Sequence, residues 1–195
     1  TYITQDKVYC LGKHAKSIYI KAISGNFYDI VQIEDIYFYR EQEYSHSNSD
    51  GVYAYMDNDM AISLPTNCEI SMECKCTGGT SSNEHRYFIA PKSLSSLSGQ
   101  PSKGLYWENA GGSSGHCGYR NNGSSTISNN LSFPTNTYVP IKITKTGTSI
   151  QICMNGQCAS GNVSYMNDNF TDWTFIFTTW NSGTEWIKNI KIKEL

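Results

Sequence analysis

The stretch formed by residues 139–157 constrains the fold more than any other part of this chain. Isoleucines alternate with polar residues on both sides of a turn at residues 146–148, and the pair Asn155-Gly156 follows directly. Alternation with a period of two is typical of a strand with one buried face. Asn-Gly between two such runs is the strongest short signal for a β-hairpin. We therefore expect three consecutive antiparallel strands that present their isoleucines to one face.

Most of the remaining sequence has the same character and predicts an all-β fold. We find no convincing helix, because short runs with period two are separated by Gly, Asn, Asp or Pro. Many short antiparallel strands with turns between them indicate a sandwich or a barrel. Residues 43–50, rich in Ser, His and Asn, are expected to form a loop. After residue 34, the expected strands are 36–40, 51–55, 60–64, 68–76, 86–90, 104–108, 115–121, 139–145, 149–154, 157–160, 173–180 and 186–193.

The chain is expected to have two parts of unequal size. Its 195 residues suit one sandwich-sized domain with a small appendage. Residues 1–34 contain three short strand-like runs, and they predict a small β module or a link to a preceding domain. The main domain is expected to span residues 35–195.

Composition argues against some partners and favours another. The formal net charge is -2 without a run of like charges, so no nucleic-acid partner is expected. No apolar stretch approaches the ~20 residues of a membrane span, so no membrane insertion is expected. Aromatic residues make up 13% of the chain and charged residues only 16%, as in surface proteins that contact carbohydrate through aromatic rings. The alternative is a tyrosine-rich β-protein without that role.

The hairpin makes one specific prediction about the seven cysteines. An odd number cannot be fully paired within one chain. With Asn155-Gly156 as the turn, Cys153 and Cys158 face each other as a non-hydrogen-bonded pair, where Cα atoms lie ~4.5 Å apart. We predict a disulfide between them under oxidising conditions; two unpaired neighbouring thiols are the alternative.

No cofactor is expected. Cys74 and Cys76 lack the spacing of a zinc pair, and no second pair follows them. Asp57 and Asp59 offer a weak alternative as a calcium site, although isolated acidic turns are usually solvated turns.

The C-terminal third carries a resemblance to a known family. Residues 138–147 and 150–156, followed by a closing strand at 186–192, resemble concanavalin A-like jelly rolls, the lectin and glucanase sandwich that includes laminin G-like modules. The pattern is similar to modules of phage and archaeal-virus tail proteins and of microbial adhesins. The resemblance covers roughly residues 35–195 and implies an antiparallel jelly-roll β-sandwich. Its motifs are structural, so they support the fold better than the function.

The same resemblance raises a catalytic alternative on the strand at 68–76. Laminarinase-type members carry Glu-Ile-Asp-Ile-Glu, and this chain has Glu69-Ile70-Ser71-Met72-Glu73. Alternation puts Glu69 and Glu73 on one face, but Ser71 replaces the central carboxylate. A retaining mechanism needs the carboxyl groups ~5–5.5 Å apart, whereas positions four apart on a flat strand are ~13 Å apart. A glucanase-like hydrolase is therefore the alternative, and no enzymatic activity is expected.

Two glycine-rich segments offer the mixture of side chains that lectin sites use. Aromatic rings stack on sugars, and amide, imidazole and guanidinium groups bind hydroxyls. The alternative is that the tryptophans belong to the core. The predicted ligand-binding residues are Trp107, Asn109, His116, Tyr119, Arg120, Trp180 and Asn181.

The sequence thus predicts a non-catalytic glycan-recognition domain of a virion tail or cell-surface adhesin that attaches to a microbial envelope. Its partner would be a cell-surface glycan, and a homo-oligomer is expected, a trimer if the chain belongs to a tail protein. The third alternative is a structural module that contacts neighbouring subunits.

Overall fold

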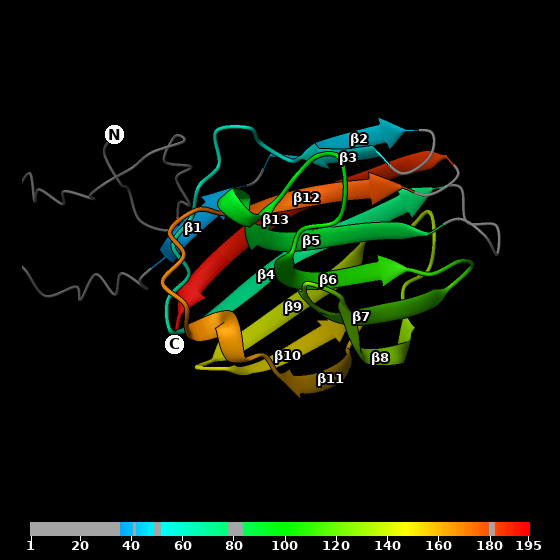
Figure 1. Ribbon diagram of the computed structural model, residues 1–195. Helices are drawn as coiled ribbons and strands as arrows, with labels where there is room; N and C mark the ends of the chain where they lie inside the picture. The colour runs from blue at the N-terminus through cyan, green and yellow to red at the C-terminus, as the bar shows by residue number, and fades with distance from the viewer. Residues whose placement is uncertain (1–35, 41, 49–51, 78–83, 180–181) are drawn as a thin grey trace, which may run out of the picture.

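Two antiparallel β-sheets pack face to face in the computed structural model (Figure 1), which confirms the predicted all-β jelly-roll sandwich. The structure describes residues 36–40, 42–48, 52–77, 84–179 and 182–195. The small module predicted at residues 1–34 lies outside the described residues. No helix in the described part of the chain is long and apolar enough to cross a membrane.

Both sheets combine strands from distant parts of the chain. The seven-stranded sheet has the order β1 (Ile36–Arg40), β13 (Gly183–Glu194), β4 (Asn67–Thr77), β9 (Val139–Thr146), β10 (Ser149–Met154) and β11 (Gln157–Asn162), and β2 (Tyr44–Asn48) also pairs with β13. The six-stranded sheet has the order β3 (Val52–Tyr55), β12 (Trp173–Thr179), β5 (His85–Pro91), β6 (Lys103–Asn109), β7 (Ser114–Asn121) and β8 (Ser124–Ser132). The short 3-10 helices η1 (Lys92–Leu94) and η2 (Ser164–Asn167) complete the described elements.

Three expectations about strands were wrong. Residues 43–50 were expected to be a loop, but β2 pairs with β13 there. The strand β8 was not predicted, because its sequence is dominated by Ser and Asn rather than by β-branched and aromatic residues. Residues 60–64 do not form a strand, and only Ile62 makes an isolated bridge, with Trp173.

The core fills the space between the sheets with large side chains from both. Trp107 of β6 and Tyr87 of β5 stack with ring centroids 5.9 Å apart, and neither exposes more than 1% of its surface. The indole of Trp107 donates a hydrogen bond to the Cys74 sulfur across the core, at 3.4 Å. Burying an aliphatic or Phe side chain stabilises the fold by ~1.5–3 kcal/mol, so this layer holds the two sheets together.

A second apolar cluster lies on the opposite, outer side of the six-stranded sheet. It consists of Tyr53, Phe88, Ala90, Tyr106 and Ile176, and Phe88 has no exposed surface. An outward-facing phenylalanine can be fully buried only if another part of the chain covers it.

The segment between η1 and β6, residues 95–102, provides that cover. Arg120 of β7 donates hydrogen bonds to Gln100 and to the Pro101 carbonyl oxygen. The Gln100 side chain also approaches the hydroxyl of Tyr53 of β3, which lies four strands away from β7 in the sheet order. The segment therefore links the two sides of this face, and Figure 1 shows it passing in front of the sheet.

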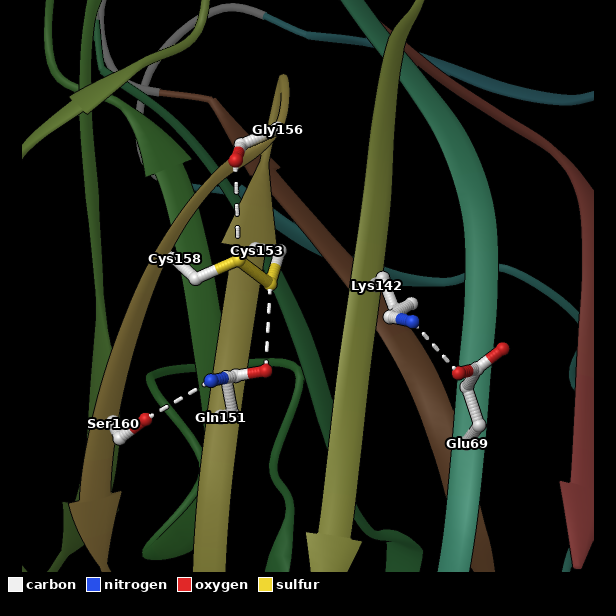
Figure 2. Close-up of a disulfide and its surroundings, with 7 residues drawn as sticks. All are labelled: Glu69, Lys142, Gln151, Cys153, Gly156, Cys158 and Ser160. Atoms are coloured by element: carbon white, nitrogen blue, oxygen red, sulfur yellow. Dashed lines mark hydrogen bonds and ion pairs between the residues drawn. A yellow bond between two sulfur atoms is a disulfide. The ribbon is translucent and has the colours of Figure 1, made fainter.

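The predicted disulfide joins β10 to β11. Cys153 pairs with Cys158 in the expected register, and their sulfur atoms are bonded, with Cα atoms 4.0 Å apart. Figure 2 shows the bond on the outer side of the seven-stranded sheet, the same side as Glu69 and Lys142. The disulfide thus ties the edge strand β11 to its neighbour.

The other described cysteines are buried thiols: Cys68, Cys74, Cys76 and Cys117. Burial raises the pKa of Cys68 and of Cys117 to about 11, and that of Cys76 to about 12. A thiol that stays protonated is a poor nucleophile and a poor metal ligand, so these cysteines act as small core residues at neutral pH.

Candidate functional site

Three ionisable residues lie side by side across the outer face of the six-stranded sheet. Arg86 of β5 is directly opposite Glu108 of β6, and Glu108 is directly opposite His116 of β7. Directly opposite side chains on one face have Cβ atoms only ~4.5–5.5 Å apart. We call these three residues the charged row.

Glu108 is the centre of the charged row. Its side chain is only 4% exposed, and one carboxylate oxygen accepts a hydrogen bond from Arg86 Nε. The other oxygen lies 3.3 Å from His116 Nδ1. Burial alone would lower the pKa of Arg86, but the hydrogen bond and charge of Glu108 outweigh it and raise that pKa. The carboxylate is therefore held between two cationic or hydrogen-donating groups.

Ser114 extends the charged row by one more contact. Its hydroxyl oxygen lies 3.5 Å from His116 Nε2, and both residues are on the outer face of β7. An imidazole whose Nδ1–H points at a carboxylate leaves Nε2 free to accept the proton of a hydroxyl. Ser114 and His116 are both accessible to solvent, with 31% of the His116 side chain exposed. The hydroxyl of Ser114, the imidazole of His116 and the carboxylate of Glu108 therefore form a chain of successive contacts.

Tyr106 and Arg120 complete this surface. The guanidinium of Arg86 lies 5.0 Å from the centre of the Tyr106 ring, and the Tyr106 hydroxyl is 3.3 Å from the hydroxyl of Thr126. Between His116 and Arg120 stands Gly118, where an added Cβ would lie 2.6 Å from the Tyr106 hydroxyl oxygen. The phenol therefore occupies the space of the absent side chain. We call the charged row together with Ser114, Tyr106 and Arg120 the polar face.

Of the predicted ligand-binding residues, His116 and Arg120 lie on the polar face. Trp107 was predicted to stack on a ligand, but its ring has no exposed surface and belongs to the core between the sheets. Asn109 is also fully buried, and its amide nitrogen donates to the carbonyl oxygens of Gly112 and Phe133, which holds the turn before β7. Tyr119 packs against the main core.

Two further predicted residues, Trp180 and Asn181, lie outside the described residues. Sequence reasoning missed Arg86, and it included Tyr106 and Glu108 in the segment around Trp107 and Asn109 without assigning them to the site. The local signal that all three share is that each stands at an alternate position of its strand, and this does not reveal which strands are neighbours.

The pair Glu69 and Glu73 lies on the other sheet and does not converge. Both project from the outer face of β4, as alternation predicted. Glu69 pairs at 2.9 Å with Lys142 of β9, on one side of β4, whereas Glu73 is 4.0 Å from Lys188 of β13, on the other side. The two carboxylates thus lean toward different neighbouring strands, which is unlike the close pair that a retaining glycosidase requires. Figure 2 shows the Glu69–Lys142 pair.

Asp57 and Asp59 form a local turn after β3. The Asp57 carboxylate accepts a hydrogen bond from the Asp59 backbone N–H at 3.0 Å. Such a bond is typical of an Asx turn. In the part of the chain that the structure describes, no group of three or more His, Cys, Asp or Glu side chains is placed to hold a metal ion.

Comparison with known proteins rests on structure alone. No family model and no curated protein matches the sequence. Carbohydrate-binding module CBM66 from Bacillus subtilis matches with a TM-score of 0.50 and 14% identity, over 75% of this chain and 84% of that chain. The Crh5 transglycosylase in complex with NAG matches with a TM-score of 0.52 and 12% identity, over 78% and 72% of the two chains. Xylan β-1,4-xylosidase from Bacillus halodurans C-125 matches with a TM-score of 0.51 and 9% identity, over 78% of this chain and 33% of that chain.

These matches contradict the prediction that the chain is not an enzyme. That prediction relied on the incomplete motif at Glu69–Glu73, yet two of these three similar structures are enzymes. One motif on one strand therefore does not exclude catalysis in this sandwich. The chain has the concanavalin A-like jelly-roll fold, which it shares with a carbohydrate-binding module, a transglycosylase and part of a xylosidase.

Proposed function

We propose that this chain binds a glycan at the polar face of the six-stranded sheet. The observation that carries the proposal is the charged row, in which Arg86, Glu108 and His116 stand side by side with polar atoms fixed by one another. Donors and acceptors that are held in place bind hydroxyl groups at a lower entropic cost than mobile surface side chains. The fold shared with a carbohydrate-binding module supports the proposal by analogy.

The exposed members of the polar face define how a sugar would be held. His116, Ser114 and Arg120 project from one face of β7, and each offers a hydrogen-bond donor or acceptor to solvent. Glu108 and Arg86 lie deeper and orient His116. A glycan would therefore lie along β7, with its hydroxyls bound at both ends of the strand.

A glycan array tests this proposal. We expect wild-type protein to bind a related set of microbial glycans, and His116→Ala to weaken binding about tenfold or more, the cost of one hydrogen bond to a charged or buried partner. Lys142→Ala, on the outer face of the other sheet, is the control and should bind as wild type. Equal binding by His116→Ala and wild type would rule out the polar face. Running the array with calcium and then with a chelator also tests the turn at Asp57 and Asp59.

The biological setting is a further part of this proposal. Attachment of a virion tail or of a cell-surface adhesin to a microbial envelope is supported by the resemblance of the sequence to modules of those proteins. Light scattering measures the mass of the protein in solution and so tests the expected homo-oligomer. A trimer would favour a virion tail protein. A stable oligomer that binds no glycan would instead support a structural module that contacts neighbouring subunits.

Hydrolysis of an ester bond is a second candidate function, favoured by the contacts of Ser114, His116 and Glu108. A hydroxyl next to an imidazole that is oriented by a carboxylate is the arrangement of an activated serine nucleophile. A fluorophosphonate probe should then label Ser114 in wild-type protein and leave His116→Ala unlabelled. Release of sugar from a glycan measures hydrolysis of a glycosidic bond. If this release survives Ser114→Ala but is lost in Glu69→Gln, hydrolysis is assigned to β4 instead.

A further inference from the structure

A lysine stands where the strand pattern calls for an apolar residue. On β9, Val139, Ile141 and Ile143 face the core, and Lys145 is the next residue in the same phase. Its side chain is buried, with the whole residue only 2% exposed. Lysine is almost never fully buried without a partner, so this position requires an explanation.

The Lys145 ammonium is held by backbone oxygens rather than by a carboxylate. It donates hydrogen bonds to the carbonyl oxygens of Pro65 at 2.9 Å and of Thr66 at 2.6 Å. An ammonium group has three N–H donors, and these two acceptors use two of them. No carboxylate forms an ion pair with Lys145 in the described part of the chain, and burial lowers its pKa. A buried positive charge here is balanced by carbonyl dipoles alone.

Lys145 lines a pocket of about 290 Å³. The pocket lies between residues 63–66, which precede β4, and residues 166–171, which precede β12. Its volume is near the lower end of the ~300–1,000 Å³ typical of ligand sites, and suits a ligand the size of a monosaccharide. The lining combines hydroxyl and amide groups, as of Thr66 and Asn169, with the ring of Phe170. This mixture suits a ligand with an apolar ring face and several polar substituents.

The one carboxylate in the pocket lining is already neutralised. Asp168 pairs with the Lys103 ammonium at 2.9 Å, and that ammonium also lies 5.5 Å from the centre of the Phe170 ring. Asp168 is paired with Lys103, which does not line the pocket. The positive charge of Lys145 is therefore left without a compensating anion. The pocket therefore favours a ligand that brings its own negative charge.

We propose that this pocket is a second ligand site, which binds an acidic monosaccharide unit through its carboxylate at Lys145. The third ammonium N–H donates to the carboxylate, and the sugar ring packs against Phe170 while the hydroxyls contact Thr66 and Asn169. The site does not depend on the polar face, because the two share no residue. In Figure 1 the loop of residues 163–172 lies near the C-terminus, whereas β6 ends at the opposite end of the sandwich, close to the charged row.

Titration of the whole chain with galacturonate, followed by amide NMR, tests the proposal. We expect shifts confined to residues 63–66 and 166–171, and at least tenfold weaker effects with galactose, which lacks only the carboxylate. Acetate should also bind at least tenfold more weakly, because it lacks the ring. Equal affinity for galacturonate and either of the other probes overturns the assignment, as do shifts located elsewhere.

Charge variants provide matched controls. Lys145→Met keeps most of the volume and should weaken galacturonate binding at least tenfold, while Lys142→Met, on the outer face of the same strand, should have no effect. If Lys145→Met does not fold, the exposed Asn169 replaces it: Asn169→Asp should weaken binding several-fold and Asn169→Lys should strengthen it. Insensitivity to the charge at Asn169 overturns the proposal. His116→Ala must leave these shifts unchanged, so failure at the polar face and failure at the pocket are distinguished.

Discussion

The outer faces of the two sheets carry similar ion pairs in very different surroundings. On the seven-stranded sheet, Glu69 and Lys142 pair across neighbouring strands with 32% and 51% of their side chains exposed. On the six-stranded sheet, Arg86 and Glu108 pair in the same cross-strand manner, with 13% and 4% exposed. The same local geometry therefore gives a solvated pair on one sheet and a desolvated pair on the other.

Neighbouring side chains account for the difference. The Tyr106 ring lies 5.0 Å from the Arg86 guanidinium, His116 lies 3.3 Å from the Glu108 carboxylate, and residues 95–102 cover another part of the same face. Exposed pairs contribute about 0–1 kcal/mol, whereas breaking a buried pair costs about 3–5 kcal/mol because one charge remains unpaired. A polar site with fixed geometry therefore forms on the covered sheet and not on the open one.

The largest expected effect is the loss of the Glu108 carboxylate. Glu108→Ala removes the buried partner of Arg86 and leaves it only the half-exposed Glu84, at 3.6 Å, so the free energy of unfolding should fall by about 3–5 kcal/mol. Urea denaturation measures this change. The double variant Arg86→Met with Glu108→Leu should recover most of the loss, since no buried charge then remains unpaired and Glu84 is half-exposed. A loss below about 1 kcal/mol in Glu108→Ala would show that the buried pair contributes no more to stability than the exposed pair Glu69–Lys142.

The next effect concerns the disulfide, the strongest tie on the open face. Cys158→Ser should lower the free energy of unfolding by about 2 kcal/mol, the loop-closure entropy of so short a loop. Thermal unfolding with and without reductant measures the effect, and the variant should not respond to reductant. An intact-mass thiol count that finds all seven cysteines free would contradict the bond itself.

A smaller effect should appear at alkaline pH on the covered face. Burial raises the pKa of Tyr53 and of Tyr106 above the usual value near 10. Because the folded state holds these protons more tightly, their contribution to stability is full below pH 10 and is lost as the pH rises further. We expect Tyr53→Phe to reduce the alkaline loss in unfolding free energy by on the order of 1 kcal/mol.

Wild type and Tyr53→Phe should be compared at pH 8 and pH 10.5, because the buried thiols titrate in the same direction in both proteins. An identical alkaline loss in the two proteins would show that Tyr53 is not desolvated.

The smallest effect is expected for the open-face pair. Glu69→Gln should change the free energy of unfolding by less than about 1 kcal/mol, and added salt should remove most of the change. Denaturation at two salt concentrations measures it. A loss comparable with that of Glu108→Ala would show that exposure does not separate the two pairs.

The sequence alone predicted strand pairing correctly where a short turn fixes the register of two neighbouring strands. The pairing of Cys153 with Cys158 follows from the Asn155-Gly156 turn, because only two residues separate the strands. The strands β2 and β8 were missed, since tertiary pairing rather than residue propensity makes them strands.

The candidate site was only partly predictable for two physical reasons. The pairing of Arg86 with Glu108 depends on the connection between β5 and β6, and no local turn motif specifies that register. Trp107 was assigned to a ligand because it stands beside a glycine-rich stretch, and both faces of β6 are buried, so burial does not mark one side of the strand as the core side. His116 was found because it follows a glycine-rich turn, a feature visible in the sequence.

The polar edge strands β8 and β11 affect how this domain associates with other copies of itself. The sheets end at β8 and β11, which contact each other and lie together at the lower rim in Figure 1. β8 consists mainly of Ser and Asn, β11 contains Ser, Gly and Asn, and Leu131 is the one buried residue in the two strands. A second molecule that paired along them would gain backbone hydrogen bonds but would bury little apolar surface. Pairing between copies of this domain along β8 or β11 is therefore weakly stabilised.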